Sequence, residues 1–109
     1  MFVSFEKQIS RAVLEALDAA KIPHWIDYER GYEPSGATSE DSIDKRLEEL
    51  FACDEGWIMT GTTDSDTPAD SFIYFIWGNG NHGLDCISDY GTSLEPVLAP
   101  ILKAIDDQQ

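Results

Sequence analysis

The sequence predicts a two-layer α+β sandwich, in which about three helices pack on a three- to four-stranded antiparallel sheet. Three segments carry apolar residues at helical spacing, and three or four short segments are rich in β-branched and aromatic residues. The strands follow one another with short links, which favours antiparallel pairing. The 109 residues fit one domain, 1–109, with the element order α-(β)-α-β-β-β-α.

The first predicted element is an amphipathic helix over residues 4–20. Ser4 is a suitable N-cap, and Pro23 would stop the helix. The apolar stripe expected to face the core comprises Phe5, Ile9, Ala12, Val13, Ala16, Leu17 and Ala20.

Residues 24–29 then predict a short edge strand. Alternation puts Trp25 and Asp27 on one side of it. Ile26 and Tyr28 face the other side. Residues 30–38 contain two glycines and a proline and are expected to form a loop.

A second helix is expected to begin at Thr38 or Ser39, because Thr38 and Asp41 have the spacing of a capping box. It should end near Asp54, before a glycine. The buried stripe of this helix is predicted to be Ile43, Leu47, Leu50 and Phe51.

Three strands are predicted next, over residues 57–63, 71–77 and 84–90. The segment 71–77, SFIYFIW, is apolar on both faces, which suits a central strand covered on both sides or a sheet whose second face meets a partner. In the third strand, strict alternation separates two sets of residues, Leu84, Cys86 and Ser88 on one face and Asp85, Ile87 and Asp89 on the other.

The last helix is predicted over residues 93–106. Its apolar stripe comprises Leu94, Val97, Leu98, Ile101, Leu102 and Ile105. Pro100 would either kink this helix or stand at its first regular position.

The stretch GNGNHG, residues 78–83, matches the spacing of a dinucleotide-binding loop. Such a loop needs a helix after it to bind phosphate, whereas a strand is expected here. Asn-Gly is also a strong hairpin signal, so the stretch predicts a turn between two strands.

No catalytic residue, metal site or cofactor is predicted. The two histidines and two cysteines lack metal-ligand spacing, and DSDTPAD, residues 64–70, departs from a calcium loop after its first aspartates. Cys53 and Cys86 are expected to be free thiols that behave as small buried apolar residues, although one disulfide between them is the alternative.

The excess of acidic residues is the strongest functional signal in the sequence. With 21 acidic and seven basic residues, the chain has a net charge of −14. This field repels phosphate backbones and anionic lipids, so it argues against direct nucleic-acid or membrane binding and favours a basic protein surface as partner. The N-terminus lacks the basic and apolar regions of a signal peptide, and no apolar run could span a membrane. We expect a soluble, cytoplasmic protein.

Most of the excess negative charge lies in residues 32–70, which contain eleven acidic and two basic residues. Glu48 and Glu49 stand toward the C-terminal end of the second helix, where the helix dipole disfavours them, and this hints at a partner. The predicted partner-binding carboxylates are Glu40, Asp41, Asp44, Glu48, Glu49, Asp54, Glu55, Asp64, Asp66 and Asp70. An ordinary solvated surface is the alternative interpretation.

The hairpin and the run CISDYGTSLEPVLAPI, within residues 71–102, resemble part of small acidic orphan proteins of bacteriophages and prophages. Some acidic members of that group inhibit host defence nucleases. The resemblance covers under a third of the chain and implies no catalytic residue.

These observations favour a non-enzymatic acidic binding protein, such as a phage-encoded inhibitor that imitates nucleic acid. An immunity protein against a cationic toxin is an alternative in the same class. A small enzyme or ligand-binding domain is the alternative from another class, with a pocket near Trp25, Trp57, Tyr74, Trp77 and His82. The third alternative is a homodimer whose subunits contact each other through sheet faces or sheet edges.

Overall fold

The computed structural model describes residues 5–27, 36–61, 71–78 and 85–108. These residues form three α-helices and four strands, in the predicted order. The elements are α1 (Phe5–Ala19), β1 (His24–Asp27), α2 (Ile43–Leu50), β2 (Glu55–Thr60), β3 (Ser71–Ile76), β4 (Ile87–Tyr90), a 3-10 turn (Thr92–Leu94) and α3 (Glu95–Gln108).

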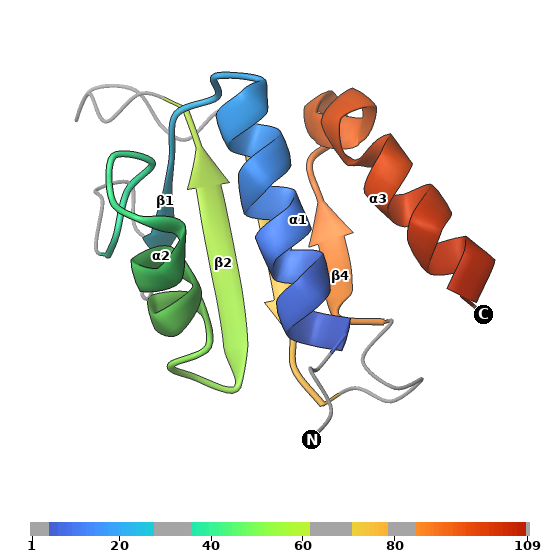
Figure 1. Ribbon diagram of the computed structural model, residues 1–109, viewed down its shortest axis with the longest axis horizontal. Coiled ribbons are helices and arrows are strands. Elements are labelled where there is room, and N and C mark those ends of the chain that lie inside the picture. Colours follow the sequence, from blue (N-terminus) through green and yellow to red (C-terminus); the bar gives the residue numbers. More distant parts are fainter. Residues whose placement is uncertain (1–4, 28–35, 62–70, 79–84, 109) are drawn as a thin grey trace.

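The strands form one antiparallel sheet in the order β1-β2-β3-β4, so each strand pairs with its neighbour in the sequence. All three helices lie on the same side of this sheet, with α1 between α2 and α3 (Figure 1). The predicted two-layer α+β sandwich is therefore confirmed. None of the helices in the described part of the chain is both long and apolar enough to cross a membrane.

Helix α1 is the central helix and buries a wider face than the predicted stripe. Its buried residues are Ile9, Ser10, Val13, Leu14 and Leu17. Leu14 and Ser10 become buried because α2 and α3 flank α1 on both sides. Phe5 and Ala20, predicted to be in the stripe, lie at the two ends and are exposed. The predicted N-cap, Ser4, lies outside the described residues.

The end of α1 is set by the backbone before Pro23 is reached. Lys21 has a φ of 58°, in the left-handed region. The Ile22 N–H donates to the Leu17 carbonyl and the Lys21 N–H donates to the Asp18 carbonyl, each at 3.0 Å. This hydrogen-bond pair is a Schellman motif, which satisfies the last carbonyls of the helix and turns the chain toward β1.

Strand β1 is an edge strand, as predicted, and all four of its residues are buried. The segment 37–39 covers its outer edge, because the Ile26 N–H donates to the Ala37 carbonyl and the Ser39 N–H donates to the His24 carbonyl. Tyr28 and most of the predicted loop 30–38 lie outside the described residues.

The predicted boundaries of α2 are wrong at both ends. The helix begins after Ser42, whose side-chain oxygen accepts from the Lys45 N–H at 3.2 Å. The Thr38 hydroxyl accepts instead from the Glu40 N–H at 3.2 Å, and this contact caps a turn that precedes the helix. The helix ends at Leu50, and β2 begins at Glu55, two residues earlier than predicted.

Strands β3 and β4 form the predicted hairpin around residues 77–86, and the Ile76 N–H donates to the Cys86 carbonyl at 2.9 Å. Gly78 begins the turn with a φ of 69°, and residues 79–84 lie outside the described part. The predicted alternation in β4 is wrong, because the register shifts between Tyr74 and Phe75. Ile87 lies opposite Phe75, whereas Asp89 lies opposite Tyr74, so the two no longer share a face.

Helix α3 runs without interruption from Glu95 to Gln108 and contains Pro100. The predicted start of the regular helix at Pro100 is wrong, because the helix already begins at Glu95, whereas the alternative of a kink at Pro100 stays a prediction. Pro100 is exposed, and so is Pro96, whose carbonyl loses its helical donor. Water can hydrogen-bond that carbonyl, which lowers the cost of the proline.

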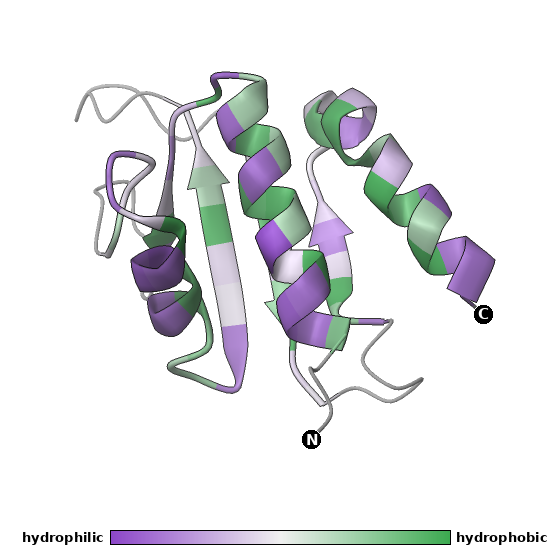
Figure 2. Cartoon of the chain, in the orientation of Figure 1, coloured by the Kyte–Doolittle hydropathy of each residue, from purple (hydrophilic) through white to green (hydrophobic). Residues whose placement is uncertain are grey.

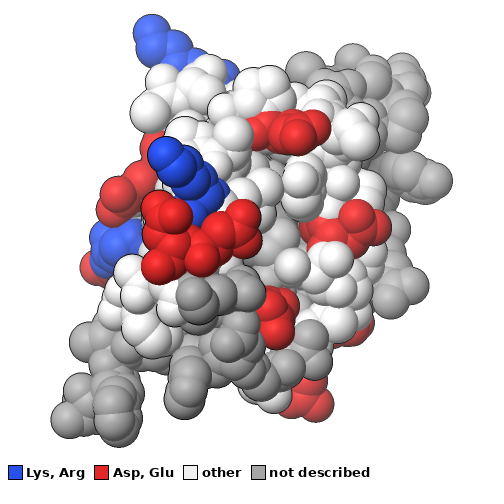
Figure 3. Space-filling view, turned by 90° about the vertical axis from the view of Figure 1, so that its right-hand side faces the viewer, with Lys and Arg blue, Asp and Glu red and all other residues white. Residues whose placement is uncertain are grey.

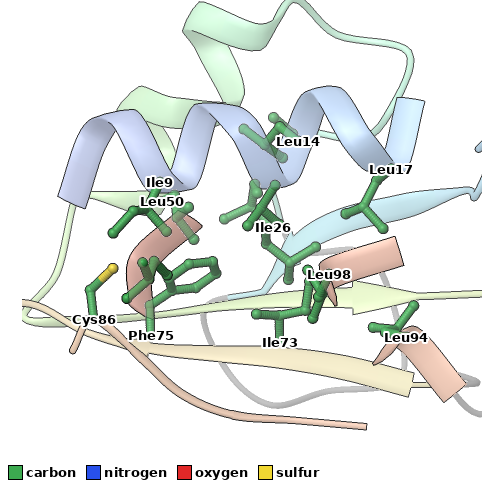
Figure 4. Packing of buried hydrophobic residues seen from close by; sticks show 14 residues of the cluster. Ile9, Leu14, Leu17, Ile26, Leu50, Ile73, Phe75, Cys86, Leu94 and Leu98 are labelled. Carbon is green, nitrogen blue, oxygen red and sulfur yellow. The ribbon is translucent and has the colours of Figure 1, made fainter. Parts of the chain in front are cut away.

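The core lies between the helix layer and the sheet. Figure 4 shows Ile9 and Leu17 of α1 directed toward the sheet that carries Ile73 and Phe75, and these four residues belong to the same buried cluster as Leu14. On β2, a Cβ at Gly56 would lie 2.7 Å from Leu50 Cδ1, so only glycine allows α2 to pack this closely. Figure 2 shows that the visible side of α2 is mainly hydrophilic, whereas α1 and α3 carry both hydrophobic and hydrophilic bands.

Candidate functional site

The predicted acidic surface is built around α2. Three of its ten carboxylates, Asp64, Asp66 and Asp70, lie outside the described residues. The seven that are described surround α2 or follow it into β2, and they are Glu40, Asp41, Asp44, Glu48, Glu49, Asp54 and Glu55. Their contacts divide them into carboxylates used within the fold and carboxylates that face solvent.

Asp41 and Glu49 hold the segment that precedes α2. The Thr38 N–H donates to Asp41 Oδ2 at 2.9 Å, and the Ala37 N–H donates to Glu49 Oε2. The hydrogen bond from the Thr38 N–H, assisted by the Lys45 ammonium 3.5 Å away, lowers the pKa of Asp41. The helix dipole disfavours Glu49 near the C-terminal end of the helix. Its hydrogen bond with the Ala37 N–H gives Glu49 a structural role there.

Asp44 pairs with a cation of the neighbouring helix. Its Oδ1 lies 2.6 Å from Arg11 Nη2, and Arg11 also lies 3.7 Å from Glu15. The pair stands beside a groove of about 440 Å³ between α1 and α2. Because Lys7 and Arg11 both line this groove, its charge is mixed.

Glu40, Glu48 and Asp54 are exposed and form no ion pair within the described part of the chain. Glu55 is also exposed, and its carboxylate accepts a hydrogen bond from the Tyr74 hydroxyl. We define the α2 acidic surface as Glu40, Asp44, Glu48, Asp54 and Glu55, the exposed members of the predicted set.

Negative charge is not confined to α2. Figure 3 views the side of the molecule formed by α3 and shows acidic side chains in several separate groups across that face. Basic side chains appear only in its left half. Exposed acids of α3 include Glu95, Asp106 and Asp107. The α2 acidic surface is therefore one part of a broadly negative molecule.

The aromatic residues of the predicted ligand pocket are divided between the two faces of the sheet. Trp57 and Tyr74 stack on the face away from the helices, with ring centroids 4.2 Å apart. Trp77 packs on the helix side against Phe51, at 4.0 Å. Trp25 is fully buried, and His82 lies outside the described residues. The three tryptophans therefore do not line a common pocket.

A polar cluster was missed in the sequence, in which the buried side chains of His24 and Arg46 contact the partly exposed carboxylate of Asp18. Arg46, only 3% exposed, donates from Nη1 and Nη2 to the two carboxylate oxygens of Asp18, at 2.9 and 3.0 Å. Arg46 Nη1 also lies 2.9 Å from His24 Nε2. The spacing from Ile43 to Arg46 and from Arg46 to Leu50 puts Arg46 on the buried stripe of α2, and this was the signal available.

The contacts of His24 define its neutral form. Nδ1 lies 2.8 Å from the Ile22 carbonyl and must donate to it, so Nε2 carries the lone pair that accepts from Arg46. Burial lowers the pKa of His24, and the Arg46 guanidinium lowers it further, against the opposing effects of the Ile22 hydrogen bond and Asp18. His24 is 1% exposed and Arg46 is 3% exposed. Their contacts with each other and with Asp18 join α1, β1 and α2, so we assign the cluster a structural role.

The two cysteines are free thiols, as predicted, but only one is buried. Cys86 is buried, and desolvation raises its pKa to about 12. Cys53 is exposed in the link between α2 and β2, so the prediction that it is buried is wrong. Among the residues that the structure describes, no three His, Cys, Asp or Glu side chains are arranged to hold a metal ion.

Comparison with protein-family models, with curated proteins and with solved structures finds no match to this chain.

Proposed function

We propose that this chain is a non-enzymatic binding domain that acts in the cytoplasm and binds a basic surface of another protein. A nucleic-acid-binding groove is such a surface, and the carboxylates of this chain would occupy it in place of phosphates. A phage-encoded inhibitor of a host protein would act in this way.

The observation that carries the proposal is the solvent-facing charge around α2. Glu40, Glu48 and Asp54 have no ion pair within the described residues, in a chain whose net charge is −14. Self-repulsion of so many carboxylates destabilises a compact domain. A complementary positive surface relieves that repulsion and also accelerates association.

The test uses two variants with the same net charge. Glu40→Gln/Glu48→Gln/Asp54→Asn removes one negative charge before α2, one within it and one after it, whereas Glu95→Gln/Asp106→Asn/Asp107→Asn removes three from exposed acids of α3. A partner is captured from host lysate at low salt and purified, and its affinity for wild type and both variants is then measured across a salt series.

We expect the affinity of the wild type to fall at least about tenfold between low and moderate salt, since exposed charge pairs are screened. The α2 triple variant should bind about tenfold more weakly than the α3 triple variant at low salt. Equal affinities of the two variants, or an affinity that does not depend on salt, would contradict the proposal.

A further inference from the structure

The sheet has two edge strands, β1 and β4, and a described segment covers only one of the two edges. Segment 37–39 lies along the outer edge of β1 and is joined to it by backbone hydrogen bonds. Within the described ranges, no strand or isolated bridge pairs with the outer edge of β4. An edge of this kind offers its backbone groups to a strand of another molecule.

The outer edge of β4 includes the backbone N–H of Tyr90. One residue further on, the Gly91 N–H donates to the Phe72 carbonyl of β3 at 2.9 Å. In an antiparallel ladder, residue pairs that exchange hydrogen bonds alternate with pairs that do not. Tyr90, which lies opposite Ile73, therefore directs its N–H away from β3.

The carboxylate of Asp89 already binds this outward N–H. The Tyr90 N–H donates to Asp89 Oδ1 at 2.9 Å, and Asp89 is exposed. A strand that added to β4 would have to displace the carboxylate and cover its charge, which costs desolvation energy. Asp89 therefore makes the Tyr90 N–H unavailable to an added strand.

A register shift beside Asp89 disturbs the same edge. Ile87 lies opposite Phe75. Asp89 lies opposite Tyr74, so β4 has one extra residue, Ser88, between these two pairs. The extra residue interrupts the regular spacing of backbone groups that an added strand needs. Short length, an extra residue and a charged side chain are three features by which proteins prevent edge pairing, and β4, with four residues, combines them.

A second copy of this chain carries a strand that matches this edge, namely its own β4. Two identical edges can pair antiparallel about a two-fold axis, because each then contacts the other in the same way. The covered edge of β1 would end such association at a dimer. The net charge of −14 on each copy opposes the contact, but salt screens exposed charges beyond about 8 Å at physiological ionic strength. Protection at close range therefore has to come from the edge itself.

We propose that Asp89 prevents the outer edge of β4 from pairing with β4 of a second copy of this chain. Without the Asp89 carboxylate, two copies join their sheets through the β4 edges into one continuous antiparallel sheet. Self-association is a property of this chain alone, so the role of Asp89 goes beyond the proposed function and does not depend on a basic partner.

The test removes the carboxylate and measures the molecular mass by light scattering, from micromolar to millimolar protein at about 0.15 M salt. Asp89→Val removes the charge and the acceptor of the Tyr90 N–H, and Asp89→Ala does so without adding a β-branched side chain. The matched control is Asp106→Val, which makes the same change at an exposed position of α3. Circular dichroism verifies that each variant folds, and Asp89→Ala decides the test if Asp89→Val does not fold.

We expect wild type and Asp106→Val to keep the mass of a monomer. Asp89→Val should self-associate at least about tenfold more strongly than wild type and approach twice the monomer mass, with Asp89→Ala between the two. Hydrogen exchange at the Tyr90 amide should slow as the Asp89→Val dimer forms. A monomeric mass for both Asp89 variants at every concentration would contradict the proposal, and so would equal association of Asp106→Val.

Discussion

The guanidinium of Arg46 donates to Nε2 of His24 at 2.9 Å, and this contact joins α2 to β1 inside the protein. Arg46 also forms the bidentate contact with Asp18 of α1. Its Nε donates to the Asp41 carbonyl at 3.1 Å, so the guanidinium is engaged on every side. The three elements α1, β1 and α2 are therefore joined by one buried cation.

Removing that cation should destabilise the domain strongly. Arg46→Met would leave the Asp18 carboxylate without its partner and the buried His24 nitrogen without its donor, at a cost of about 2–4 kcal/mol in the free energy of unfolding. Urea denaturation monitored by circular dichroism measures this cost. The matched control is Lys45→Met on the same helix, whose exposed pair with Asp41 should contribute less than about 1 kcal/mol. Equal losses in the free energy of unfolding of the two variants would show that the contacts of Arg46 stabilise the domain no more than an exposed ion pair does.

The burial of neutral His24 predicts a dependence of stability on pH. Its pKa in the folded state is lower than its ordinary value of 6.5, so the unfolded chain binds the proton more readily. The stabilisation due to His24 is complete above pH 6.5 and is lost as the pH falls from there toward the lower folded pKa.

This effect is isolated by comparing wild type with His24→Gln, because the many surface carboxylates titrate in both. The free energy of unfolding of wild type should fall relative to that of the variant between about pH 7 and about pH 5. Parallel curves over this range would show that His24 has the same proton affinity in the folded and unfolded chain.

The left-handed conformation of Lys21 predicts a stabilising substitution. A side chain at a φ of 58° crowds its own backbone, whereas glycine adopts that conformation without the penalty. Lys21→Gly should raise the free energy of unfolding by roughly 0.5–1 kcal/mol, after allowance for the extra freedom of glycine in the unfolded chain. A control is Ala20→Gly, which stands beside it outside the left-handed region and should destabilise. A loss of stability in Lys21→Gly would contradict the assigned Schellman motif.

The two thiols should differ sharply in reactivity. Cys53 is exposed, whereas Cys86 is buried and its pKa is raised to about 12, so little of its reactive thiolate exists near neutral pH. Iodoacetamide followed by intact mass measurement should add one label to the native chain and two to the urea-unfolded chain. Cys53→Ser should remove the native reaction, and rapid labelling of Cys86 in that folded variant would contradict the predicted burial.

Much of the fold could be predicted because hydrophobic spacing determines the element types. The α1 stripe, the apolar run of β3 and the Asn-Gly hairpin each identified their element correctly. The boundaries of α2 could not be read in the same way, because Thr38, Ser39 and Ser42 are all suitable caps. The pairing of segment 37–39 with the edge of β1 keeps Thr38 and Ser39 out of the helix, so Ser42 is the cap.

The candidate site was less accessible from the sequence. Net charge identified the acidic segment, but composition does not show that Asp41 and Glu49 hold backbone N–H groups while Glu40 and Glu48 face solvent. The two-sided apolar character of residues 71–77 did signal a second sheet face. The register shift that brings Asp89 beside Tyr74 depends on tertiary pairing, and strict alternation placed Asp89 with Ile87 instead.

Binding of a basic partner through the α2 acidic surface is tested most directly by NMR titration of the isotope-labelled chain with nona-arginine at low salt. Each backbone amide reports on its own surroundings, so the contact surface is identified without a variant. We expect the largest chemical-shift changes at the amides of α2 and at those of Glu40 and Asp54. Largest changes on α3 or β4, with the amides of α2 unchanged, would contradict the proposal.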